Sequence, residues 1–516
     1  MHRRPNATVI MKWATKVRRH ISIAVTVGLL MVSALQLPLR THSFLLSSAS
    51  SAVKSVWPYS DALLAAPAAP PDLDQWVARA MRTFDVPGIG LSIVKDDEVV
   101  IAKGYGVRRL GEPGAVDSHT LFGIASNTKV FTATALGLLV EEKKIDWDAP
   151  VVRYLPWFAL WDPYVTRELT VRDLLVHRSG LGLGAGDLLW WPPSTYSRPE
   201  IARRLRFIQP ATSFRSAYAY DNVLYLIAGE LIESVSGQSW EDFVSSRILQ
   251  KVGMRDSNVR HSAAGAGRNV AATHAPIDGH VRPIAPFDSD NTNPAGGINA
   301  SADDMARWLR VQISGGMLAD GSRLFSTATA RQLTRIVTPI PINDPPPELS
   351  PLRTNFHGYA LGLDIRDYRG HKLVTHTGGL PGYVSRVAMI PDVSLGVAVL
   401  TNQESGEAFD AIAFHILDHY LNAPPFDWID GYQKVLTRSR ESTAALERSA
   451  TASCRSPSMP ARTATGGMET SKSSSRAAGC RCASRTRRRS AAISSTGSTT
   501  PSSSAGRIAS CGPTRT

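Results

Sequence analysis

Two short segments near residue 90 alternate in the way expected of β-strands. Gly88–Lys95 and Val99–Gly106 each follow the two-residue period of a strand. The acidic run Asp96-Asp97-Glu98 lies between them and predicts a hairpin connection. Four more strands are predicted late in the chain: Tyr359–Ile365, Lys372–Thr377, Tyr383–Ile390 and Leu395–Leu400. We therefore expect one sheet assembled from segments that are far apart in the sequence.

Between these two sets of strands, apolar residues recur near the 3.6-residue period of an α-helix. The longest such stretch follows Ser126 and ends at the charged run Glu141-Glu142-Lys143-Lys144. Other predicted helices are 72–84, Val171–His177, Pro199–Ile208, Val223–Val235, Trp240–Leu249, Ser301–Ile313 and Glu407–Leu421. Strands at both ends with helices between them indicate an α+β fold with a helical insertion.

The positive charge of the chain lies at its two ends. The 516 residues carry a formal net charge of +13. Residues 1–40 contribute +7 and residues 451–516 contribute +10, which leaves −4 for residues 41–450. The body is mildly acidic, so the overall basic charge gives no indication of nucleic-acid binding, and we expect none.

Residues 1–70 are interpreted as a targeting segment and a linker. Basic residues precede an apolar run from Ile21 to Leu37. This run is long for the core of a signal peptide and short for a membrane span, so a cleaved signal and a membrane anchor both stay open. Either one predicts export to a periplasmic or extracellular location.

The expected folded domain covers residues 71–425, followed by a linker at 426–450 and a low-complexity tail. Residues 451–516 contain 16 serines and no aromatic residue, leucine or valine, a composition that cannot build a core. All four cysteines lie there, which excludes a thiol nucleophile or a disulfide in the body. Two interpretations of the tail are open: a disordered basic extension, or a C-terminal domain translated out of frame.

A serine and a lysine three residues apart open the longest predicted helix. In Ser126-Asn127-Thr128-Lys129 this spacing places both side chains on one helix face. A serine becomes an effective nucleophile when a base lies within hydrogen-bonding reach. The same spacing at Ser51–Lys54 falls in a linker, and at Ser92–Lys95 it falls in a strand, where the two side chains point to opposite faces. Ser126 could also simply cap its helix, so the later motifs decide between the two interpretations.

Two later motifs complete a known pattern. They are Tyr220-Asp221-Asn222 and His376-Thr377-Gly378-Gly379. In this order the three motifs resemble the serine β-lactamase and penicillin-binding protein superfamily, in its class C-like branch of carboxypeptidases and esterases. The similarity covers residues 72 to about 421. It implies a β-lactamase/transpeptidase-like fold, with an antiparallel sheet flanked by helices and an all-helical subdomain.

The resemblance also implies a role for each matching residue. Ser126 would attack a carbonyl to give an acyl-enzyme, and Lys129 and Tyr220 would handle the proton that it loses. Which of the two is the base stays open. Asn222 would hydrogen-bond Lys129 or the substrate. The backbone N–H groups of Ser126 and Gly379 would form the oxyanion hole, and Gly378 would let substrate approach the strand closely.

One residue departs from the pattern of the superfamily. Its third motif usually begins with a lysine, whose charge helps to hold a substrate carboxylate, whereas this chain has His376 before Thr377. Because an imidazole is mostly neutral near pH 7, we expect weak recognition of anionic substrates and better turnover of neutral esters or amides.

The expected function is therefore that of an exported serine hydrolase acting through an acyl-enzyme on esters, amides, D-amino-acid peptides or β-lactams. Two alternatives are a penicillin-recognising sensor that acylates without turnover, and an inactive product if the tail replaces a needed domain. No cofactor and no metal are expected, because His415 and His419 have ligand spacing but no evident third ligand. The partner is a small-molecule or peptide substrate, and the sequence predicts no oligomeric state.

Overall fold

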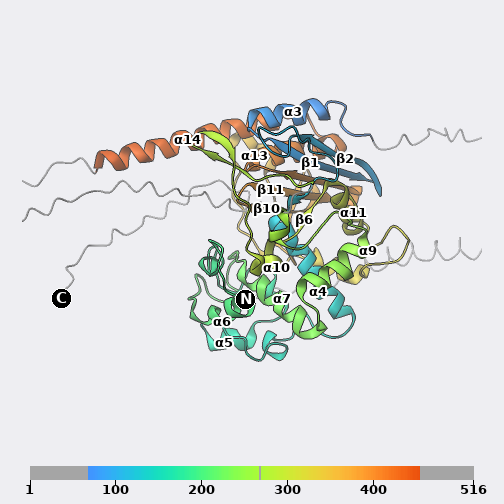
Figure 1. Cartoon of the computed structure of the whole chain (residues 1–516), viewed down its shortest axis with the longest axis vertical. Coiled ribbons are helices and arrows are strands. Elements are labelled where there is room, and N and C mark those ends of the chain that lie inside the picture. Colours follow the sequence, from blue (N-terminus) through green and yellow to red (C-terminus); the bar gives the residue numbers. More distant parts are fainter. Residues whose placement is uncertain (1–67, 266–268, 454–516) are drawn as a thin grey trace, which may run out of the picture. The chain divides into compact units, whose positions relative to one another are not determined.

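The computed structural model describes residues 68–265 and 269–453, which include an eight-stranded antiparallel sheet (Figure 1). The strands run in the order β2-β1-β12-β11-β10-β9-β8-β7. Their bounds are β1 (Gly88–Lys95), β2 (Glu98–Gly106), β7 (Thr338–Pro339), β8 (His357–Tyr359), β9 (Asp364–Tyr368), β10 (His371–Leu380), β11 (Tyr383–Ile390) and β12 (Leu395–Thr401). The first predicted hairpin lies beside the last predicted strand, as expected, because β1 pairs with β12.

The two faces of the sheet are covered by different helices. Apolar side chains of β1 alternate with small ones, so that Ile89, Leu91 and Ile93 share a core with three helices on one face. These helices are α3 (Leu73–Thr83), α13 (Gly406–Tyr420) and α14 (Trp428–Ser453). On the other face the Ser92 hydroxyl donates to the Ala302 carbonyl, 2.5 Å away, at the start of α11 (Ala302–Ile313).

A helical region follows the first hairpin and holds the start of the site. Its two longest helices, α4 (Lys129–Glu141) and α7 (Val223–Ser236), pack against each other (Figure 1). Shorter helices surround them: α5 (Pro163–Glu168), α6 (Arg198–Arg204), α8 (Trp240–Val244), α9 (Gln250–Val252), α10 (Asn293–Gly296) and α12 (Thr327–Leu333). Two small antiparallel pairs join β3 (Phe122–Gly123) to β6 (Asn299–Ala300), and β4 (His274–Ile277) to β5 (His280–Pro283). Nearly every residue of α4 is buried, including Lys129, so this helix is a central element rather than an amphipathic surface helix.

The fold class predicted from the sequence is confirmed, but three predicted elements are wrong in detail. Residues 359–365 do not form one strand, because the chain turns at Gly362, whose φ is +80°. A Cβ there would lie 2.9 Å from the Lys129 backbone, so only glycine fits. Of Val171–His177, only Arg172–Leu174 forms a 3₁₀ turn. Trp240–Leu249 is a helix whose second half, Ser245–Leu249, is a π-turn.

The boundary predicted at residue 425 is also corrected. Residues 426–450 were expected to be a linker, yet α14 begins at Trp428 and buries Trp428, Ile429 and Tyr432 against the sheet-covering helices. These apolar residues recur at helical spacing, which explains why the segment packs instead of connecting.

Among the described residues, no helix is long and apolar enough to cross a membrane. The apolar run Ile21–Leu37 and the tail from residue 454 lie outside the described residues, so the expectations for them stay predictions.

Candidate active site

Ser126 lies in a 3₁₀ turn, Ala125–Thr128, that leads directly into α4. The residue before it, Ala125, has a φ of +49°, a conformation that is unfavourable for any residue with a side chain. Such backbone strain persists only where surrounding packing enforces it, and it is typical of functional sites. The turn therefore holds the hydroxyl in a position that an ordinary helix start would not give.

Lys129 is fully buried and makes three hydrogen bonds. Its Nζ lies 2.9 Å from Ser126 Oγ, 2.9 Å from Asn222 Oδ1 and 3.0 Å from the Ala295 carbonyl oxygen. Burial lowers the pKa of Lys129 to about 7, against a smaller opposing effect of Asp221 and Asp187. A neutral amine has two hydrogens and one lone pair. The amide and carbonyl oxygens can accept the two hydrogens, which leaves the lone pair directed at the serine hydroxyl.

Tyr220 contacts the same hydroxyl from the other side. Its phenol oxygen lies 2.9 Å from Ser126 Oγ, and the Nζ atom of Lys129 lies 5.1 Å from the centre of the Tyr220 ring. Tyr220 precedes α7, and Asn222 is the residue immediately before the first turn of that helix. The second motif is thereby fixed at a helix start that packs against α4.

A buried histidine supports this second motif. The ring of His177 lies 4.2 Å from that of Tyr220 and 4.4 Å from that of Tyr359, and its Nδ1 accepts the Asp221 backbone N–H at 3.2 Å. Burial holds the pKa of His177 well below its usual range and raises that of Asp221 to about 7. Both groups therefore position Tyr220 without placing a full charge next to it at neutral pH.

The third motif lies on β10, beside the Ser126 turn. A Cβ on Gly378 would lie 2.2 Å from the Ile124 carbonyl oxygen and 3.0 Å from the Ala125 side chain. Only a glycine allows this approach of the strand to the turn. The segment that contains Gly379 thus runs next to the nucleophile, as an oxyanion-binding role requires.

His376 is buried and both of its ring nitrogens have partners. Nδ1–H donates to the Thr377 carbonyl oxygen at 2.6 Å, and Nε2 accepts the Tyr359 hydroxyl at 2.7 Å. This pattern is that of a neutral imidazole. Burial, helped by the charge of Lys129, lowers the pKa of His376 to about 3. The residue is therefore neutral at pH 7.

These segments match a known family. The model of the Beta-lactamase family matches residues 73–421. The chain belongs to this family. An unguisins hydrolase of Aspergillus violaceofuscus is 28% identical over 70% of this chain and 67% of its own length. Penicillin-binding protein 4 of Amycolatopsis lactamdurans is 28% identical over 64% of this chain and 86% of its own length. The octameric penicillin-binding protein homologue from Pyrococcus abyssi superposes with a TM-score of 0.59 at 28% identity, over 69% of this chain and 78% of that one.

The structure brings Ser126, Lys129, Tyr220 and Asn222 into hydrogen-bonding contact and places Gly378 beside the Ser126 turn. It also adds groups that sequence reasoning missed. The Ala295 carbonyl is a partner of Lys129, and the Pro294 carbonyl accepts the Thr132 hydroxyl at 2.7 Å. A backbone carbonyl leaves no signature in side-chain chemistry, although the following pair Gly296-Gly297 marks this segment as one of close approach, with Gly296 against Ala125. The contact of His177 with Tyr220 was not foreseen from the sequence either.

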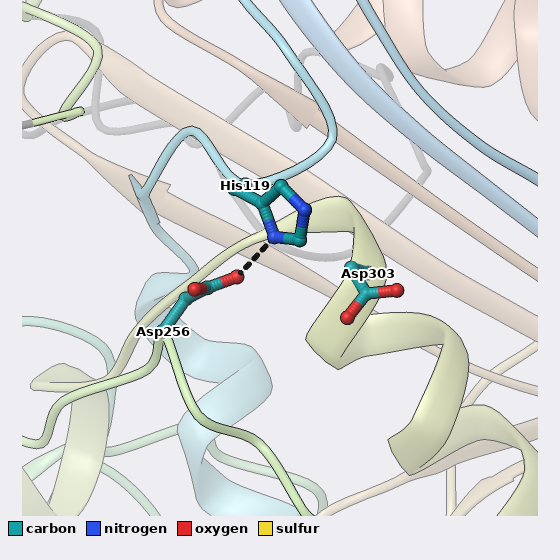
Figure 2. A group of neighbouring side chains, drawn as sticks. All are labelled: His119, Asp256 and Asp303. Carbon is teal, nitrogen blue, oxygen red and sulfur yellow. Dashed lines mark hydrogen bonds and ion pairs between the residues drawn. The ribbon is translucent and has the colours of Figure 1, made fainter.

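One group of possible metal ligands occurs among the described residues, outside the three motifs. Figure 2 shows His119, Asp256 and Asp303, whose ligand atoms lie within 4.8 Å of one another. Each has a partner already: His119 Nδ1 lies 2.9 Å from Asp256 Oδ2, and Arg307 pairs with Asp303 at 3.0 Å. His119 is 60% exposed. The first contact joins two loops and the second lies within α11, and we assign no ion to these residues.

His415, weighed as a metal ligand, has an ordinary structural role. Its Nε2 lies 3.0 Å from Asp72 Oδ1, and its ring stacks on that of Trp76 with centroids 3.9 Å apart. These contacts hold α13 against α3.

Proposed function

We propose that this Beta-lactamase family member is a serine hydrolase that works through an acyl-enzyme on Ser126. The observation that carries the proposal is the buried Lys129 amine, 2.9 Å from the Ser126 hydroxyl and with a pKa near 7. A base of that pKa is about half deprotonated at neutral pH, which is the favourable range for general-base catalysis.

The geometry supports a specific path for the proton. The neutral Lys129 amine takes the proton of Ser126 as the hydroxyl oxygen attacks the carbonyl carbon. The Tyr220 phenol, 2.9 Å from the same oxygen, then passes a proton to the leaving group. Lys129 replaces the proton of the phenol, and the reverse sequence activates water for deacylation. Attack creates two charges: the Lys129 ammonium, which Asn222 and the Ala295 carbonyl can hydrogen-bond, and the oxyanion of the tetrahedral intermediate, which the backbone N–H groups of Ser126 and Gly379 would bind.

The preferred substrates are neutral esters and amides, including D-amino-acid amides and peptides whose charged ends lie away from the site. His376 occupies the place where the superfamily usually has lysine, and both of its nitrogens are engaged by Tyr359 and Thr377. An uncharged ring without a free donor gives little attraction for a carboxylate. The name of one relative, an unguisins hydrolase, is consistent with substrates beyond penicillins.

The decisive experiment is intact-protein mass spectrometry after exposure to a fluorophosphonate and, separately, to a penicillin. Ser126→Ala is the control. Fluorophosphonate labelling on Ser126 of the wild type alone supports the nucleophile, whereas labelling that survives in Ser126→Ala contradicts it. A reporter ester then separates hydrolase from sensor, because a burst followed by steady turnover indicates an enzyme and a burst followed by silence indicates a sensor.

We also propose that the protein is exported, on the basis of the basic and apolar pattern that ends at Leu37. Cell fractionation of the full chain, followed by N-terminal sequencing, tests this. A cytoplasmic protein with an intact N-terminus contradicts export, and the sequencing separates a cleaved signal from an anchor.

A further inference from the structure

One cavity among the described residues, of about 460 Å³, is not lined by Ser126, Lys129 or Tyr220. Its floor is formed by β9, β10 and β11 and includes Arg366, Thr375 and Arg386. Its walls come from the start of α13 and from α14, and its roof is the proline-rich segment 340–354. A cavity of this size is in the range that holds small-molecule ligands.

The parts of this cavity are held in place by specific contacts. Arg438 of α14 pairs with Glu348 of the roof at 2.7 Å, and Leu349 is buried beneath it. The backbone N–H of Ile340 donates to the His357 carbonyl at 2.9 Å. The roof segment is therefore tied to α14 at Glu348 and to β8 at Ile340.

One charged side chain in the cavity has no polar partner among the described residues. Arg366 makes no ion pair or side-chain hydrogen bond there, and its nearest defined contact is the Phe414 ring, 6.0 Å from the guanidinium carbon. The neighbouring Arg386 pairs with Asp410, which also accepts the Tyr432 hydroxyl at 3.0 Å, while its buried Nε has no hydrogen-bond partner among the described residues. Arg366 is partly exposed and lines the cavity, so its five N–H donors are open to a ligand there.

The carboxylates of the lining do have partners. Asp364 binds His357 at 2.7 Å, Glu404 accepts the Gly382 backbone N–H at 2.9 Å, and Glu407 accepts the Ser405 hydroxyl at 3.1 Å. Asp344 pairs with Arg353 at 3.3 Å. The charged lining residue without a hydrogen-bond or ion-pair partner among the described residues is thus Arg366, a cation. The surrounding acids disfavour a dianion such as phosphate, so a group with a single negative charge fits best.

The remaining lining residues indicate that most of the ligand is apolar. Apolar side chains face the cavity from the roof and from both helices: Ile340, Ile342, Leu349, Leu352, Phe409 and Val435. We propose that this cavity is a second ligand site, which binds a small amphipathic monocarboxylate through Arg366 with its apolar body under the roof. The ligand is therefore an apolar acid of the N-acyl amino acid or aryl-alkanoate type. His376, Thr377 and Tyr359 also line the cavity, so a bound ligand would lie next to the strand of the third motif.

The proposal is tested with 4-phenylbutanoate and its neutral amide, using isothermal titration of the full chain carrying Ser126→Ala. The substitution removes the nucleophile, so the result does not depend on the proposed hydrolase function. Saturable binding of the acid is expected, with the amide about 10-fold or more weaker, because a charge-assisted hydrogen bond to a guanidinium is lost. Inorganic phosphate should not compete. Equal binding of acid and amide, or no binding of the acid, overturns the proposal.

Two sets of variants locate the site. Arg366→Met keeps the length of the side chain. It should lower the affinity for 4-phenylbutanoate about 10-fold or more and change the affinity for the amide little. Ile342 is 47% exposed at the cavity, so substitutions there should not disturb folding. Ile342→Glu adds a negative charge, so it should lower the affinity for 4-phenylbutanoate more than its matched control Ile342→Gln does. If Arg366→Met fails to melt cooperatively, the Ile342 pair decides, and equal affinities in that pair contradict the site.

Discussion

The pH dependence of acylation is the most direct test of the proposed base. The pKa of Lys129 falls from its ordinary value of 10.5 to about 7, with burial as the main cause. This shift corresponds to about 5 kcal/mol in favour of the neutral amine. If Lys129 is the base, kcat/KM for a p-nitrophenyl ester should rise with pH and level off above about 8. Between pH 6 and pH 8 the rise should be about 10-fold, since the neutral fraction grows by that factor.

A lysine with an unshifted pKa would behave differently in the same assay. The rate would then rise about 100-fold between pH 6 and pH 8 and would continue to rise beyond pH 9. Rates are measured from pH 5.5 to 9.5 and corrected for spontaneous hydrolysis of the ester. A profile without a plateau below pH 9 refutes the assignment of the low pKa to the catalytic base.

Two variants connect the profile to the residue. Lys129→Arg carries a guanidinium that stays protonated, so it should lower the plateau about 10³-fold and abolish the rise with pH. Tyr220→Phe should lower the rate but keep the midpoint near 7, because it removes the phenol and leaves the amine. If Tyr220→Phe abolishes the rise and Lys129→Arg preserves it, then the phenol is the base, and the path proposed above is wrong.

Three further predictions concern the third motif. Compared with His376→Gln, His376→Lys should raise the ratio of kcat/KM for anionic over neutral substrates about 10-fold, since it restores a charged donor, and an unchanged ratio contradicts the charge argument. The pKa of His376 is lowered from 6.5 to about 3 by burial, so the unfolded state binds more protons than the folded state between those values, and stability falls as pH drops below 6.5. Chemical denaturation should therefore show the wild type losing about 2 kcal/mol more than His376→Gln between pH 8 and pH 5, and equal losses would show that His376 titrates normally. Gly378→Ala would place a Cβ 2.2 Å from the Ile124 carbonyl oxygen and should reduce fluorophosphonate labelling of a folded protein about 10²-fold. Its control is Gly406→Ala, which meets nothing closer than 3.6 Å and should label normally.

The local sequence pattern was sufficient to predict those helices, strands and turns whose neighbours in space are also neighbours in sequence. The hairpin of β1 and β2 turns at Asp96 and Asp97, which both have positive φ, and acidic residues are among those that tolerate this conformation. The helix predicted at Ser301–Ile313 is also confirmed, and Ser301 caps it by accepting the Asp304 backbone N–H. The break in residues 359–365 was not predicted, because the packing of Gly362 against the Lys129 backbone joins segments that are far apart in the sequence.

In the site, too, contacts between sequence neighbours were predictable and contacts between distant segments were not. The spacing of Ser126 and Lys129 predicts that the two side chains are neighbours, and the structure places them 2.9 Å apart. The remaining partners of Lys129 come from segments 93 and 166 residues away, and no local pattern announces the Ala295 carbonyl. The lack of an ion-pair partner for Arg366 could not be predicted either, because the sequence of a strand does not show which residues surround its side chains in the fold.

The chemistry of the proposed site depends on that second, distant set of contacts more than on the motif itself. A serine and a lysine one helical turn apart on an exposed helix would leave the lysine charged, because water stabilises an ammonium and its pKa would stay near 10.4. Here α4 is buried along nearly its whole length, and α7 and α10 close over the Lys129 amine. The same burial sets His376 to its neutral form and leaves Asp221 close to half protonated. The motif supplies the groups, but the enclosure that makes them a base and a nucleophile at neutral pH is a property of the whole fold.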